Sequence, residues 1–167
     1  MAASTLTIRL NRRPDGAVVF ELRRADGSTT WQKRSGTAAE FFAIHDLTHF
    51  AVESTLGFSR AFYGLVAEGW ELADFGHPWP RGPLPAEAVP AEVIVGCFDT
   101  ARAAREPLTA ERCNATAASY FANAGQSSPV HVSDAELDAI RARLSDLVRR
   151  WQALATADSL ELTFPPA

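Results

Sequence analysis

Hydrophobic and polar residues alternate at both ends of this chain, whereas the long middle part has the spacing of helices. The apolar positions are Leu6, Ile8 and Leu10 near the start and Leu160, Leu162 and Phe164 near the end. A period of two is typical of a strand with one buried face. We therefore expect the last segment to return to the N-terminal strands and join their sheet, as an edge or a central strand.

The N-terminal region, residues 5–35, has the pattern of a three-stranded meander. Two turn signals, Pro14-Asp15-Gly16 and Ala25-Asp26-Gly27, separate three short runs of strand-like sequence. An Asp-Gly pair between alternating segments favours a hairpin. The third run, residues 28–33, is more polar than the first two, and we expect it near an edge of the sheet.

The middle of the chain has helical character from Gly36 onward. Thr37 and Glu40 have the spacing of a capping box, and Ser133 and Glu136 repeat it. The stretch 76–90 holds five prolines and two glycines and is predicted to be a loop. The predicted helices cover residues 38–56, 59–75, 91–105, 109–124 and 134–155.

These elements predict an α+β protein with a single domain over residues 1–167. Its small antiparallel sheet would consist of the meander at 5–35 and the returning strand at 159–164, packed against about five helices within 37–155. A chain of 167 residues buries about two thirds of the surface that its unfolded form exposes. It therefore needs no disulfide and no structural metal to stay folded.

Composition argues against several classes of partner and location. The net charge is −4, and the arginines within 134–150 alternate with acidic residues, so we expect no nucleic-acid partner. No apolar run approaches the roughly 20 residues that span a bilayer, and no signal peptide is visible, so we expect no membrane partner. Cys97 and Cys113 are predicted to be buried free thiols, which fits a cytoplasmic protein.

The candidate functional residues lie in the helix predicted over 38–56. His45, His49 and Glu53 are four residues apart and stand in one row on that helix. A His-x-x-x-His pair can direct both imidazoles at one metal ion. The helix is apolar nearly all round, so these polar side chains should be buried and need partners. A metal ion would satisfy them, and so would hydrogen bonds among the histidines and nearby carboxylates.

A third ligand is expected to come from another element. The Cα atoms of His45 and Glu53 lie about 12 Å apart along a helix axis, which would force a nearly linear arrangement. Glu68 follows His49 after an 18-residue spacer, enough for a turn and an antiparallel helix. The candidate ligands of a divalent metal, zinc first, are therefore His45, His49 and a carboxylate, with Glu68 ahead of Glu53.

The pattern His45-Asp46-x-x-His49, the spacer and Glu68-Gly69-Trp70 resembles the signature of gluzincin metallopeptidases. The resemblance implies that His45, His49 and Glu68 bind zinc and that the protein is a metal-dependent hydrolase acting on a peptide or other small molecule. Asp46 stands where that family has the glutamate that acts as general base. We expect Asp46 to be the catalytic residue, either as a displaced base or by orienting a ligand.

A second interpretation treats the same residues as structural. In it, the protein is a non-enzymatic binding or scaffold protein, and its helical surface mediates contacts within a homo-oligomer. His45, His49, Glu53 and Glu68 would then form a buried hydrogen-bond network without a metal.

Overall fold

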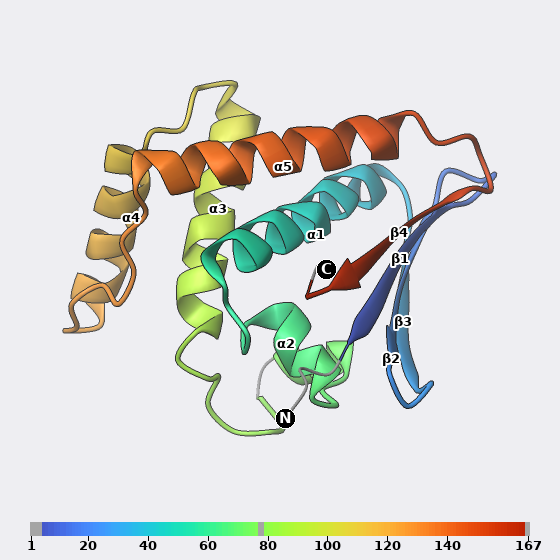
Figure 1. The fold of residues 1–167 in the computed structure, drawn as a ribbon, viewed down its shortest axis with the longest axis horizontal. Coiled ribbons are helices and arrows are strands. Elements are labelled where there is room, and N and C mark those ends of the chain that lie inside the picture. The colour runs from blue at the N-terminus through green and yellow to red at the C-terminus, as the bar shows by residue number, and fades with distance from the viewer. Residues whose placement is uncertain (1–4, 77–78, 166–167) are drawn as a thin grey trace.

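The computed structural model describes residues 5–76 and 79–165 as a four-stranded antiparallel sheet with helices against one face (Figure 1). The strands are β1 Leu6–Arg12, β2 Val18–Arg24, β3 Thr29–Arg34 and β4 Ser159–Phe164, in the order β3-β2-β1-β4. The predicted α+β fold is confirmed. The C-terminal strand returns to pair with β1, so β3 and β4 are the two edges.

Five α-helices and one 3-10 turn form the other layer. They are α1 Thr37–Leu56, α2 Phe62–Ala67, η1 Leu72–Phe75, α3 Ala88–Ala104, α4 Ala110–Asn123 and α5 Asp134–Gln152. Helix α1 lies in the middle of this layer, where it contacts α2, α3, α5 and the strands β2 and β3 (Figure 1). No helix in the described part of the chain is long and apolar enough to cross a membrane.

The predicted helix over 59–75 does not form as one element. Helix α2 ends at Ala67, and the chain passes through Gly69 at a φ of 110° before the 3-10 turn η1. A positive φ at Gly69 cannot continue a right-handed helix. The chain therefore does not run back along α1 as one long antiparallel helix.

One of the two predicted capping boxes is wrong. The residue before the first turn of α1 is Gly36, and no side chain caps it. Glu40 instead accepts a hydrogen bond from Nε1 of Trp151 on α5, at 3.1 Å. The second capping box forms as predicted, with Ser133 and Glu136 bonded to each other's backbone N–H groups.

A few predicted segments fall partly outside the described residues. Residues 1–4, part of the N-terminus for which we predict no signal peptide, lie outside the described residues. So do residues 77–78 of the predicted loop. That loop ends earlier than predicted, because α3 begins at Ala88 and includes Pro90 in its first turn. Proline is tolerated there, since the N–H groups of a first turn have no partner within the helix.

A buried arginine connects the sheet to the segment that follows α2. The alternation of β2 puts Arg24 on the core face, where it is 8% exposed. Its guanidinium donates to the carbonyl oxygens of Val66 and Trp70 at 2.7 and 2.6 Å, and to Glu71 at 2.9 Å. Three acceptors around one planar cation fix the position of this turn relative to β2.

Replacing Arg24 by lysine should weaken the fold. A single ammonium group cannot reach all three acceptors, so we expect Arg24→Lys to lower the free energy of unfolding by about 2 kcal/mol. Urea denaturation followed by circular dichroism measures this loss. The neighbouring exposed Arg23 provides the matched control, and Arg23→Lys should leave the stability within about 0.5 kcal/mol of the original. Equal stabilities of the two variants would contradict the role given to Arg24.

Candidate metal centre

The candidate site lies where α1 packs against α3. Helix α1 presents His45 and His49 from successive turns, with their ring centroids 4.8 Å apart. Helix α3 presents Glu92 and Asp99, which are seven residues apart and therefore share one face of the helix. At this contact His45 faces Asp99 and His49 faces Glu92. Four polar side chains thus meet where α1 packs against α3.

Each histidine binds a carboxylate through its Nδ1 atom. Nδ1 of His45 lies 2.6 Å from Oδ2 of Asp99, and Nδ1 of His49 lies 3.0 Å from Oε1 of Glu53. An ionised carboxylate only accepts hydrogen bonds, so these contacts place a proton on each Nδ1. The nitrogen of each ring that remains for a metal ion is therefore Nε2.

His45, His49 and Glu92 form a group that could hold a metal ion. One donor atom of each lies within 4.8 Å of the other two. Among residues 5–76 and 79–165, this is the only group of three or more His, Cys, Asp or Glu side chains that could hold a metal ion. Nε2 of His49 is 3.3 Å from Oε1 of Glu92. Zinc bonds to nitrogen and oxygen are about 2.0–2.2 Å long, so the three donors would have to move closer together to bind one ion.

The carboxylates behind the histidines are themselves held in place. Asp99 accepts a hydrogen bond from Arg102 at 2.8 Å. Glu53 has a fully buried side chain and accepts hydrogen bonds from the backbone N–H groups of Phe62 and Tyr63, at 3.2 and 3.0 Å. Outer carboxylates of this kind orient ligand imidazoles and raise their basicity. Glu53 thus lies behind His49 and is not one of the three grouped donors.

The group is open to solvent on one side. The side chain of Glu92 is 51% exposed and that of His45 is 23% exposed, whereas His49 is 3% exposed. Phe41, which is 45% exposed, stacks on the His45 ring at a centroid distance of 6.0 Å. Three protein donors with an exposed side leave room for a water molecule or a small ligand on an ion.

Asp46 binds a cation from the sheet. Its Oδ2 accepts a hydrogen bond of 2.8 Å from Arg34 on β3, and the side chain is 4% exposed. The Arg34 guanidinium also lies over the Phe42 ring, 4.1 Å from its centroid. Burial raises the pKa of Asp46 to about 6, and the charge of Arg34 opposes that rise only in part. These contacts tie α1 to β3.

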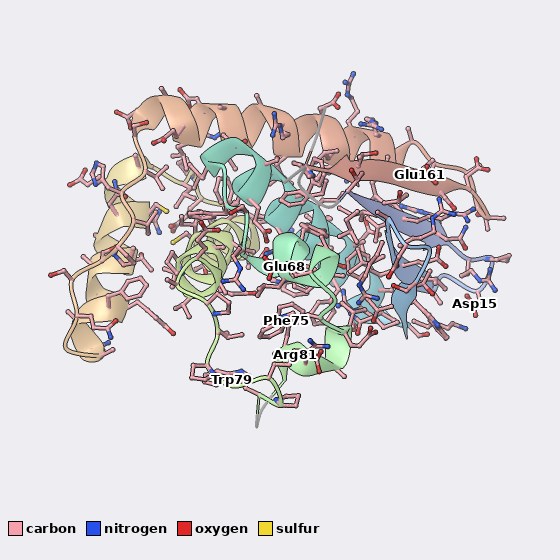
Figure 2. The ribbon with its side chains drawn as sticks, turned by 60° about the horizontal axis from the view of Figure 1, so that its bottom comes forward. Asp15, Glu68, Phe75, Trp79, Arg81 and Glu161 are labelled. Atoms are coloured by element: carbon pink, nitrogen blue, oxygen red, sulfur yellow. The ribbon has the colours of Figure 1, made fainter. Side chains whose placement is uncertain are left out.

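Glu68 is not among the grouped donors. It lies at the surface, at the end of α2 (Figure 2), where its two carboxylate oxygens accept hydrogen bonds from Arg60 at 2.8 and 2.9 Å. Its side chain is 42% exposed. The physical reason is the early end of α2, because the predicted antiparallel helix that would carry Glu68 back along α1 does not form.

Glu92 and Asp99 were missed by the reasoning from sequence. Glu92 follows His49 by 43 residues, beyond the reach of any local spacing rule. One signal was available, since the pair lies seven residues apart in the helix predicted over 91–105. Two carboxylates on one face of a mostly apolar helix could have been matched to the two histidines on the other helix.

His49 holds a proton between two carboxylates. Burial by itself lowers the pKa of His49, but the hydrogen bonds to Glu53 and Glu92 and their charges raise it to about 10. A pKa in the folded state above the ordinary value of 6.5 means that the folded chain binds this proton more tightly than the unfolded chain. The resulting stability is complete below that ordinary value and is lost as the pH rises through the folded-state value.

This pH dependence should be visible after dialysis against a chelator. We expect the stability advantage of the original protein over His49→Gln to be largest near about pH 6 and to shrink as the pH approaches about 10. Urea unfolding of both proteins at several pH values measures the difference, and titrating groups remote from His49 cancel. An advantage that is constant over this range would contradict the ion pairing of His49.

Comparisons of the chain with protein-family models, with curated proteins and with solved structures find no match. The chemistry of the site is therefore inferred from its own residues.

Proposed function

We propose that this protein binds one divalent metal ion through Nε2 of His45, Nε2 of His49 and the carboxylate of Glu92. One observation carries the proposal. Each histidine gives its Nδ1 to a separate carboxylate, and the two rings together with Glu92 form a group of donors within 4.8 Å of one another. In metal-binding histidines, one ring nitrogen typically binds the ion while the N–H of the other donates a hydrogen bond to a carboxylate.

Zinc is the first choice for this donor set. Two imidazoles and one carboxylate are a common ligand set of zinc sites that carry out catalysis. Two histidines and one carboxylate also hold iron(II) in oxygen-dependent enzymes, so the identity of the ion has to be measured with iron(II) among the ions offered. The donors come from two helices that are packed together, which supports a site that is preformed.

The reaction class that this site supports best is hydrolysis of a small amide or ester. A divalent ion with three protein ligands can lower the pKa of a bound water molecule and polarise a carbonyl oxygen. As in the gluzincin motif, His45 and His49 would be two of the metal ligands. The third ligand would be Glu92, and not Glu68 as the motif implies. Asp46, paired with Arg34, would position α1 and its ligands rather than accept a proton.

Metal analysis tests the proposal directly. Protein purified without a histidine tag and loaded with zinc should contain about one ion per chain by mass spectrometry. Glu92→Gln should weaken zinc binding by about 100-fold or more, and Asp99→Asn by about 10- to 100-fold, because the first loses a ligand and the second an orienting group. Isothermal titration calorimetry measures both changes.

Glu68→Gln is the matched control for Glu92→Gln. It makes the same change on a surface glutamate that is paired with Arg60, and it should leave zinc affinity unchanged. Calorimetry in buffers of different ionisation enthalpy should also show proton release near neutral pH, because His49 must lose its proton to bind an ion. Loss of binding in Glu68→Gln with retention in Glu92→Gln would reverse the ligand assignment. An original protein that binds no ion would refute the proposal.

A structural hydrogen-bond network is the second candidate function of these residues. It is supported by the contacts themselves, because His45 and His49 already have carboxylate partners. Under this alternative, zinc and other divalent ions leave the thermal unfolding temperature unchanged, and the role of the protein is binding or scaffolding. The homo-oligomer that this alternative expects is measured by light scattering during size-exclusion chromatography.

Lengthening Asp46 tests its catalytic role. If Asp46 is a base that is one methylene too short, zinc-loaded Asp46→Glu should hydrolyse peptide or ester substrates faster than the original protein, since positioning errors near about 1 Å can cost about 100-fold. If Asp46 positions α1 through Arg34, the variant gains no activity, and Asp46→Asn and Arg34→Gln both lower stability. Hydrolysis of fluorogenic peptides and nitrophenyl esters, beside urea unfolding, separates the two outcomes.

A further inference from the structure

The two cysteines of the chain meet where α3 packs against α4. Cys97 lies on α3 and Cys113 on α4, and both are free and buried. Sγ of Cys97 lies 4.0 Å from the carbonyl oxygen of Cys113, and the two side chains are close enough for each to shift the pKa of the other. Two cysteines that meet across a helix interface are a pair that can be oxidised to a disulfide.

The two thiols differ in their access to small molecules. A cavity of about 320 Å³ lies between α3 and α4, and Cys97 is among its lining residues, whereas Cys113 is not. The cavity is also lined by Glu92, Gly96, Arg112 and Tyr120. Cys113 is fully buried, and Cys97 is 5% exposed. A small solute that enters the cavity would therefore meet the sulfur of Cys97 first.

We propose that Cys97 and Cys113 are a peroxide-sensitive thiol pair that forms a reversible disulfide between α3 and α4, with Cys97 as the thiol that reacts first. The oxidant is a small hydroperoxide, with hydrogen peroxide as the simplest member of that class. The proposal rests on the geometry of α3 and α4 and does not depend on a metal at the histidines.

The chemistry takes place in two balanced steps. In the first, the Cys97 thiolate attacks a peroxide oxygen: an S–O bond forms, the O–O bond breaks, and the departing hydroxide takes up a proton to become water. In the second, the sulfur of Cys113 attacks the sulfenic acid of Cys97. An S–S bond forms, the S–O bond breaks, and water leaves with the thiol proton of Cys113. Two thiols are oxidised, and one peroxide is reduced to two waters.

The electrostatics of the pair suit these roles. The hydrogen bond from Cys113 lowers the pKa of Cys97 to about 7, in spite of its burial. The same bond and burial raise the pKa of Cys113. The thiolate is the reactive form of cysteine, so the group that lines the cavity is also the group that is ionised near neutral pH.

The test treats the complete chain with hydrogen peroxide in the presence of a chelator, which removes metal-catalysed oxidation. Free thiols are then alkylated in denaturant and the products are measured by mass spectrometry. We expect both cysteines to escape alkylation and the chain to lose two hydrogen atoms, with full reversal by dithiothreitol. Arg102 and Arg112 lie between the two cysteines, so trypsin should release their peptides joined only while the disulfide is present.

Two variants establish the order of the steps. Cys113→Ser should stop at a sulfenic acid on Cys97 that dimedone labels, and Cys97→Ser should leave Cys113 unmodified under the same treatment. The result with the original protein decides the proposal even where a variant does not fold. Two cysteines that stay fully alkylatable, a disulfide between two chains, or oxidation of Cys97 to a sulfinic acid without a disulfide would each overturn it.

Discussion

Helix α1 carries buried polar side chains, and the need to give each of them a partner organises the structure around it. Asp46 binds Arg34 on β3, His45 and His49 bind carboxylates of α3, and Glu53 accepts backbone N–H groups at the start of α2. An unpaired buried polar group costs about 1–3 kcal/mol, and a buried charge costs more. These contacts therefore fix three neighbouring elements relative to one helix.

The candidate metal centre results from the same pairing of buried histidines with carboxylates. Asp99 and Glu53 accept hydrogen bonds from the Nδ1 atoms of His45 and His49, so Nε2 of each ring is the nitrogen available to a metal ion. Glu92 of α3 is the third donor of the group. Helix α3 contributes to two sites, since it also brings Cys97 against Cys113 on α4. The carboxylate of Glu92 is exposed, and Glu92 and Cys97 both line the cavity between α3 and α4.

Structural predictions that depend on residues close together in the sequence are mostly confirmed, whereas those that depend on contacts between distant residues are less accurate. The strands follow from alternation within a few residues, and the histidine pair follows from one helical period. The capping box at Thr37 was wrong because Glu40 finds a partner on α5, which is distant in sequence. The predicted ligand Glu68 depended on a long helix after α1, and the turn at Gly69 removes that helix.

The sequence by itself determined the α+β architecture, the return of the last strand and the row of His45 and His49. Periodicity and turn residues encode these features locally. The tertiary structure decided which carboxylates meet the histidines, because the packing of α3 on α1 brings Glu92 and Asp99 across 43 and 54 residues of chain. It also decided that Asp46 faces Arg34 and that Cys97 lies against Cys113. Such contacts depend on how helices pack, which no local spacing specifies.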